Sequence, residues 1–162
     1  MLTSTTKKII VRRFDRESIP GFVNLATYLQ PDFVELLLVS GVAQRIPFTE
    51  IKSVAFVKDF DAPRGQPEAK SFQSRPKIEG LWVRMRFRDG ELTEGLLANN
   101  LAQTDTQGFQ VTPPNSSGNV QRLFVPRVAL EEMVVLAVVG GKSSRMKPKE
   151  TQEQIGLFSD AG

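Results

Sequence analysis

Two stretches decide the fold of this chain because they resemble each other: "IVRRFDRESIPGFVN" (residues 10–24) and "RMRFRDGELTEGLLAN" (residues 84–99). Asp15 matches Asp89, and Gly21 follows Asp15 at the same distance as Gly95 follows Asp89. A recurring order of turn residues indicates a tandem duplication in which each copy is one structural unit. The competing interpretation is two unrelated hairpin regions that share generic turns.

Further landmarks extend the match toward the C-terminal side of each copy. The segment "AQRIPFTEIKSVAFV" (43–57) resembles "VQRLFVPRVALEEMVVL" (120–136). The matching pairs are Phe33 with Phe109, Gln44 with Gln121, Arg45 with Arg122, Ile51 with Leu130, Val54 with Met133 and Phe56 with Val135.

The pattern of apolar residues predicts an all-β protein. Short apolar runs are bounded by Gly, Pro, Asn and Asp, and no segment has the sustained spacing of an amphipathic helix. In each copy this pattern predicts five short strands, with one helical turn before the fifth strand. Gly21 and Gly95 fall inside strand-like runs, where glycine usually marks a bend or a bulge.

Glycine, proline and charge divide the chain into five segments. We expect a flexible N-terminus (1–8), a first unit (9–57), a polar linker (58–80), a second unit (81–138) and a disordered tail (139–162). Within the second unit, "TPPNSSGN" (112–119) reads as a loop where a partner could dock.

Five short, bent antiparallel strands with a late helical turn resemble the Sm-like barrel. The segment "IPFTEIKSVAFV" (46–57) is similar to the closing motif of bacterial Sm-like RNA chaperones. The resemblance implies two tandem Sm-like five-stranded bent barrels with internal pseudo-symmetry. In those chaperones the turn presents an aromatic residue, a lysine and a histidine to RNA, whereas the matching positions here read Phe48-Thr49-Glu50 and Pro126-Arg127-Val128. Runs such as "RRFDRE", "RPKIEGLWVR" and "QRLFVPR" also resemble an uncharacterised bacterial protein family.

The composition removes the usual chemistry of enzymes. The chain contains no cysteine and no histidine, so it has no thiolate, no imidazole base and none of the ligands that zinc prefers. No apolar run is long enough to span a bilayer, and the N-terminus does not resemble a signal peptide. We therefore expect a cytoplasmic protein without catalytic activity, without a cofactor or metal and without a membrane partner.

The segment "LWVRMRFRDG" (81–90) raises the question of nucleic-acid binding. Its alternation places Val83, Met85 and Phe87 on one face of a strand and Arg84, Arg86 and Arg88 on the other. The favoured interpretation is a half-buried strand with a solvated face, neutralised by Glu91 and Glu94. The competing interpretation is a phosphate-binding strip, which would need stacking aromatic residues beside the arginines.

Other charged motifs are weaker signals. Arg12 and Arg16 resemble the first half of the PilZ cyclic-dinucleotide signature, but the second half of that signature is absent. The net charge of +3 comes from the terminal segments, because residues 11–137 carry equal numbers of acidic and basic side chains. A neutral body argues against non-specific affinity for nucleic acid.

The sequence thus favours a binding or assembly module that recognises an unknown protein partner. The alternative function is RNA or nucleotide binding through Arg84, Arg86, Arg122 and Arg127. The apolar fourth and fifth strands of each unit predict a homo-oligomer, most simply a closed ring in which each chain supplies two barrels. The alternative assembly state is a monomer whose free edge is covered by the linker or by "IGLFSD" (155–160).

Overall fold

Short antiparallel strands are the main secondary structure of the computed structural model, which describes residues 5–61, 68–100, 102 and 104–140. The first half of the chain forms β1 (Thr6–Arg13), β2 (Ile19–Asn24), β3 (Phe33–Leu38), β4 (Ala43–Pro47) and β5 (Ile51–Val57). The second half forms β6 (Gly80–Phe87), β7 (Leu92–Leu97), β8 (Gly108–Val111), β9 (Val120–Pro126) and β10 (Leu130–Val139). The expected 3₁₀ turns precede the fifth strands as η1 (Phe48–Glu50) and η3 (Arg127–Ala129). The predicted all-β fold class is confirmed.

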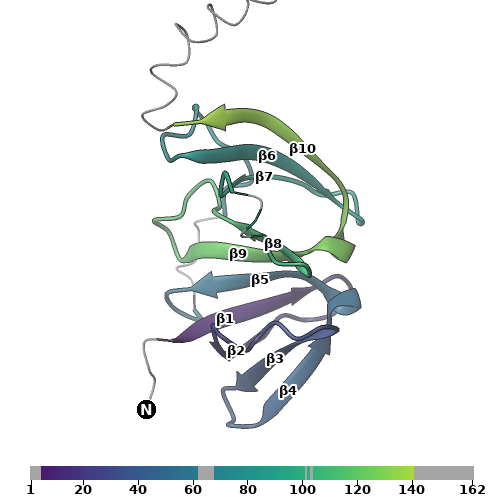
Figure 1. Cartoon of the computed structure of the whole chain (residues 1–162). Coiled ribbons are helices and arrows are strands. Elements are labelled where there is room, and N and C mark those ends of the chain that lie inside the picture. Colours follow the sequence, from purple (N-terminus) through teal and green to yellow (C-terminus); the bar gives the residue numbers. More distant parts are fainter. Residues whose placement is uncertain (1–4, 62–67, 101, 103, 141–162) are drawn as a thin grey trace, which may run out of the picture.

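The strands form two antiparallel sheets that do not coincide with the two halves (Figure 1). One sheet has seven strands in the order β4-β3-β2-β1-β5-β9-β8, and the other has three in the order β10-β6-β7. The described strands form no closed barrel, so the predicted pair of Sm-like barrels is not confirmed in that detail. The large sheet crosses from one half to the other because β5 pairs with β9, and the unpaired backbone groups of these two apolar strands satisfy each other within one chain.

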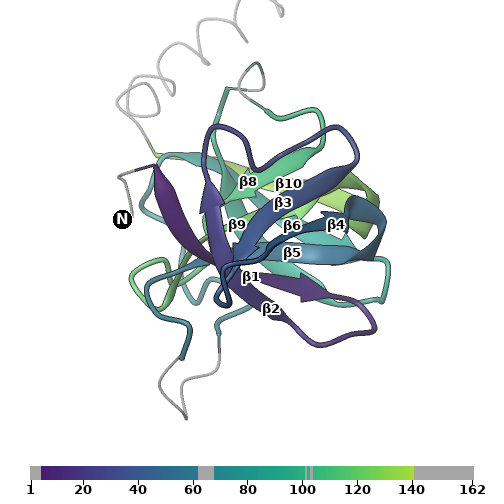
Figure 2. The same cartoon turned by 90° about the horizontal axis from the view of Figure 1, so that it is seen from below.

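Within each half, however, the strands follow the same order: fourth, third, second, first and fifth. In the second half the contact between β7 and β8 is reduced to a single bridge, in which Leu96 and Thr112 exchange backbone hydrogen bonds of 2.9 and 2.8 Å. Figure 2, which views the molecule from the β4 end, shows that the strands of the first half curve around one another rather than lie flat.

The strand registers of the two halves also match. Ile9 lies opposite Gly21 on β2 and Phe56 on β5, and Val83 lies opposite Gly95 on β7 and Val135 on β10. The register between the first and fifth strands shifts in both halves at one equivalent place, where Lys52 and Glu131 are skipped. This agreement in register supports the tandem duplication.

Gly21 and Gly95 occupy equivalent sites of close approach. A Cβ atom at position 21 would lie 2.7 Å from both Leu36 Cδ1 and the carbonyl oxygen of Leu37. A Cβ atom at position 95 would overlap with Val111 Cγ1 and would lie 3.2 Å from the carbonyl oxygen of Thr112. In both halves the absent side chain therefore lets the third strand pack against the second.

The structure corrects three of the sequence landmarks. Phe33 and Gly108 are equivalent, because they pair with Pro47 and Pro126, the prolines that precede the two turns. Phe109 therefore lies one position beyond the equivalent of Phe33. The same prolines place Arg45 level with Phe124 and the turn Phe48–Glu50 level with Arg127–Ala129. Matching by residue identity had misaligned the recurring glutamine-arginine pair by two positions.

The apolar side chains form two cores that share one wall. The first core contains side chains of β1 to β5 together with Phe124 of β9. The second core contains side chains of β6 to β10 together with Ala55 and Val57 of β5. Because successive residues of a strand point to opposite faces, β5 and β9 can fill both cores at once. That explains why these two strands are apolar on both faces.

Residues 70–75 of the predicted polar linker, the connector between the halves, pack against the second half. The Phe72 ring lies edge-on to Trp82, with ring centroids 5.9 Å apart, and the backbone N–H of Phe72 donates to Glu94. Arg75 donates a hydrogen bond of 3.2 Å to the carbonyl oxygen of Val138 near the end of β10. Residues 62–67 of the connector and most of the expected tail (141–162) lie outside the described residues. No helix in the described part is long and apolar enough to cross a membrane.

Candidate functional site

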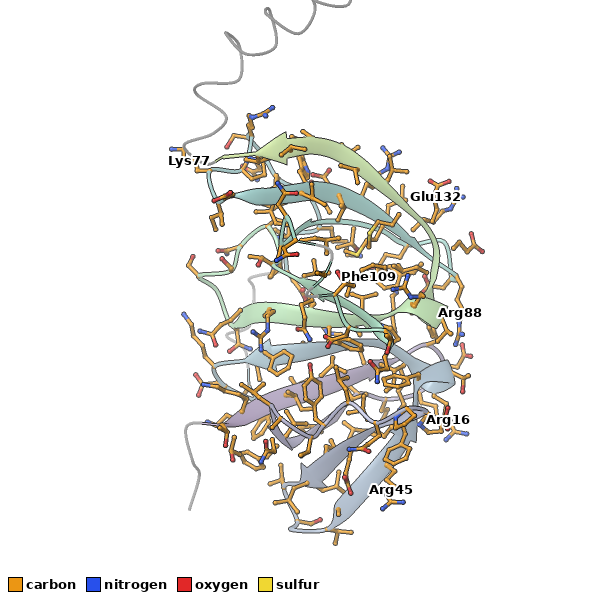
Figure 3. The ribbon with its side chains drawn as sticks, viewed as in Figure 1. Arg16, Arg45, Lys77, Arg88, Phe109 and Glu132 are labelled. Atoms are coloured by element: carbon orange, nitrogen blue, oxygen red, sulfur yellow. The ribbon has the colours of Figure 1, made fainter. Side chains whose placement is uncertain are left out.

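The arginine stripe of β6 lies on a solvated face, as the sequence favoured. Val83, Met85 and Phe87 are buried, whereas Arg84, Arg86 and Arg88 are exposed. Figure 3 shows Arg88 on the same side of the molecule as Glu132, Arg16 and Arg45, so charges of both signs follow this side from β10 to β4.

The stripe has different neighbours from those expected. Arg86 contacts Glu131 and Glu132 of β10, each at 3.4 Å, and not an acid of its own hairpin. Glu94 lies directly opposite Arg84 but accepts a hydrogen bond of 2.8 Å from the Trp82 indole. Arg84 makes no ion pair among the described residues.

The four arginines proposed for an anion site are not brought together. Arg84 and Arg86 lie in the three-stranded sheet, Arg122 lies on β9 of the other sheet, and Arg127 lies on the turn η3. Arg122 stacks 4.6 Å from the centroid of the Phe56 ring, and Arg127 stacks 4.6 Å from that of Phe109. Three of the four therefore have their own partners on separate elements.

The arginine pair that resembles a cyclic-dinucleotide motif is engaged with carboxylates. Arg12 forms an ion pair of 2.6 Å with Glu68 of the connector. Arg16 lies 3.7 Å from Glu50, which follows β4 in the turn η1. These contacts link elements of the fold and leave no cluster of unpaired cations at the pair.

A charged cluster at the junction of the two halves was not found by sequence reasoning. Lys52 of β5 donates to Asp89 and Glu91 in the β6–β7 hairpin, at 2.7 Å each. The Lys52 ammonium also lies 5.1 Å from the centroid of the Phe87 ring. The only sequence signal is that Lys52 is the single charged residue in the apolar run "IKSVAFV".

The pKa values of this cluster indicate that all three groups are charged near neutral pH. Burial opposes the charge on Lys52, but the hydrogen bonds to Asp89 and Glu91 outweigh it and raise the pKa of Lys52 above 10.5. The hydrogen bond from Lys52 lowers the pKa of Asp89 below 3.8. Burial raises the pKa of Glu91, but the bond and charge of Lys52 outweigh it and lower the value below 4.5. Each charge in the cluster has a partner, and the two ion pairs join β5 of the first half to the β6–β7 hairpin of the second half. We call this cluster the clamp.

The loop 112–119, where a partner was expected to dock, is fastened to the start of the connector. Lys58 Nζ donates to the carbonyl oxygen of Ser117 at 2.8 Å, and Asp59 and Asn119 exchange hydrogen bonds of 2.9 and 3.0 Å. A shallow pocket of about 500 Å³ lies beside these contacts and includes Ile10 and Val57 in its lining. No group of three or more acidic side chains in the described part of the chain could hold a metal ion.

Two sheet ends are the most conspicuous surfaces of the described structure. Because β7 and β8 meet at the Leu96–Thr112 bridge, β4 and β10 are left as free edges, and Figure 1 shows them at opposite ends of the stack of strands. Nine large apolar residues among those described are exposed, and six of them lie on β10 or on the hairpin of β3 and β4. These six are Leu37, Val39, Val42, Val135, Leu136 and Val138.

The comparisons with known proteins give a family but no activity. No curated protein and no solved structure matches the chain. A family model described as "Family of unknown function (DUF6982)" matches residues 5–137, which span all ten strands except the last two residues of β10. The chain therefore belongs to the DUF6982 family.

Proposed function

We propose that this protein is a non-catalytic binding and assembly module of the cytoplasm, which recognises another protein chain through its free edges β4 and β10. The observation that carries the proposal is the concentration of exposed apolar side chains on β10 and on the hairpin that β4 forms with β3. A free strand presents unpaired N–H and C=O groups to which another strand can add. Apolar side chains beside those groups would be covered by the added strand.

The chemistry of the edges favours a protein partner over a nucleic acid. Residues 133–139 of β10 are all apolar, and its only charged residues are Glu131 and Glu132. An RNA-binding surface needs cations and stacking aromatic side chains that face solvent. The rings of Phe56 and Phe109 are instead covered by Arg122 and Arg127.

A relation to Sm-like proteins is part of the same proposal. It is supported by the common strand order of the two halves, by a glycine at an equivalent site of close approach in each second strand and by the 3₁₀ turn before each fifth strand. In this interpretation the halves are two open Sm-like units that share the β5–β9 pair.

Site-specific photo-crosslinking in the native host tests the function. A photoreactive amino acid is placed at Val135 on β10 or, as a control, at Leu92 on β7, because the two side chains are equally exposed at 53% and 52%. We expect protein adducts from position 135 and few from position 92. Adducts that ribonuclease removes would contradict the proposal and favour the alternative of RNA binding. Equal protein adducts from both positions would contradict the assignment of the contact to β10.

A further inference from the structure

The two halves of the molecule are joined by one pair of antiparallel strands. In the middle of the large sheet, β5 of the first half pairs antiparallel with β9 of the second half. Val54 lies opposite Phe124, Ala55 opposite Leu123 and Phe56 opposite Arg122. The junction therefore pairs the fifth strand of one half with the fourth strand of the other.

The two strands left without this kind of partner are of the same two types. β4 is the fourth strand of the first half, and β10 is the fifth strand of the second half. The equivalence is set by backbone geometry, because the registers of β1 with β5 and of β6 with β10 agree over residues 51–56 and 130–135 and share the bulge at Lys52 and Glu131. One end of the molecule thus presents a free fourth strand and the other end a free fifth strand, and these are the two types of strand that pair at the internal junction.

We propose that β10 of one copy pairs with β4 of the next copy in the manner of β5 and β9, so that the chain assembles head to tail with itself. The inference rests on the proposed function and names its partner. The equivalent register sets Met133 opposite Arg45, Val134 opposite Gln44 and Val135 opposite Ala43. The register of β5 with β9 then shifts, with Val57 opposite Val120, so Leu136 would lie opposite Gly41 and the exposed Val42 would be the skipped residue of the bulge.

The composition of β10 fits a strand with neighbours on both sides. Exposed edges are usually protected from pairing by charges, prolines or short length. β10 has ten residues and no proline, and its acidic residues lie only near its start. Arg75 reaches a single carbonyl oxygen, that of Val138, so the middle of the strand stays open among the described contacts.

The charges predict that the junction between copies is weaker than the junction within the chain. Lys52 clamps Asp89 and Glu91 across the internal junction. The register makes Glu131 the equivalent of Lys52, and the hairpin match makes Asp15 and Glu17 the equivalents of the two acids. At the junction between copies, Glu131 of one copy would therefore face Asp15 and Glu17 of the next copy. Like charges at close range oppose association, so a lysine at position 131 should strengthen it.

A head-to-tail contact closes into a ring when its rotation permits and otherwise gives a filament. Light scattering on the full chain over a wide range of concentration distinguishes these from the single chain of 18.0 kDa. We expect a multiple of this mass, which Val135→Lys reduces to one chain and which the matched control Leu92→Lys leaves unchanged. Glu131→Lys should lower the concentration at which the multiple forms.

Cysteine pairs test the register, because the chain has no cysteine of its own. Chains carrying Val135→Cys are mixed with chains carrying Ala43→Cys, and the covalent dimer is followed during oxidation. Residues directly opposite in an antiparallel pair lie close enough for a disulfide after small adjustment. We expect this pair to form faster than Val138→Cys with Ala43→Cys, and equal rates would overturn the proposed register.

A full chain that stays monomeric at every concentration, with the connector or residues 141–162 covering β10, would overturn self-assembly. So would an oligomer that Val135→Lys leaves intact. The proposed function fails separately: crosslinks from position 135 to a different protein would support that function while the monomer removes this inference. Crosslinks to no protein at all would remove both.

Discussion

β5 and β10 occupy equivalent places in the two halves, yet one is buried and the other is exposed. Six of the seven residues of β5 are buried, and only Lys52 is partly exposed. In β10 a single residue, Val139, is buried, although the strand is as apolar as β5. The difference is the neighbouring strand, since β5 lies between β1 and β9 whereas β10 pairs only with β6. Burial of a strand in this protein therefore depends on the edge it meets more than on its own composition.

The largest effect is expected from replacing two residues at equivalent positions, Phe56 on β5 and Val135 on β10. Phe56 is 5% exposed and Val135 is 53% exposed. We expect Phe56→Ala to lower the free energy of unfolding by about 3–5 kcal/mol, because it leaves a cavity in the first core. Val135→Ala should change it by less than about 0.5 kcal/mol in the monomer, since the side chain already faces solvent.

Urea denaturation measures both variants at concentrations where light scattering reports a single chain. A similar loss in the two variants would mean that β10 is buried even in the monomer. The contrast between the strands would then not hold in solution.

The second test asks whether the halves behave alike where their contacts are alike. Gly21→Ala and Gly95→Ala should each destabilise by about 1–3 kcal/mol, because a methyl group at either site overlaps with the third strand. Gly118→Ala is the control, since its nearest neighbour is the side-chain end of Asn115 at 3.2 Å. Thermal and urea unfolding of the three variants would contradict the equivalence if only one half responded.

The third test concerns the charged clamp, which only β5 carries. Lys52→Met should remove about 1 kcal/mol at neutral pH, a modest effect because both acids are about one-third exposed. Its control is Glu131→Gln on β10, whose exposed ion pair with Arg86 should contribute less than about 0.5 kcal/mol.

The pH dependence of stability tests whether the ion pairs of the clamp stabilise the folded protein. Asp89 and Glu91 have pKa values below their ordinary 3.8 and 4.5, so their contribution is present above those values and is lost as pH falls through the lowered pKa values. Lys52 has a pKa above 10.5, so its contribution is present below that value and is lost as pH rises through the raised pKa. Urea midpoints between pH 3 and pH 6 should therefore fall less steeply in Lys52→Met, and an unchanged slope would exclude the clamp.

The smallest effect is expected from the arginines. Arg122→Ala should cost about 0.5–1 kcal/mol, because its guanidinium stacks on Phe56 of β5. Arg84→Ala should cost less than about 0.5 kcal/mol, because no ion pair holds it among the described contacts. Chemical unfolding of both variants, measured in triplicate, resolves the difference between their free energies of unfolding. An equal and larger loss in both would mean that Arg84 has a partner that the described residues do not include.

Much of the fold could be predicted because it is encoded in local patterns. The alternation in "VRMRFRDG" sets the buried and exposed faces of β6, and the recurring Asp and Gly positions align the first two strands of each half. The alignment of later strands failed because residue identity is a poor guide where the backbone, through Pro47 and Pro126, sets the register. The partners of the arginines were missed because they lie on distant strands, as Glu131 and Glu132 do for Arg86.

The sequence by itself predicted that the chain is all-β, that its halves are repeats and that Gly21 and Gly95 occupy equivalent places in them. These features follow from side-chain periodicity and size, which are local properties. Only the tertiary structure decided that β5 pairs with β9, that the cores share a wall and that β4 and β10 remain free. The reason is that pairing between strands uses the N–H and C=O groups that nearly every residue carries, so side-chain patterns do not specify which edges meet.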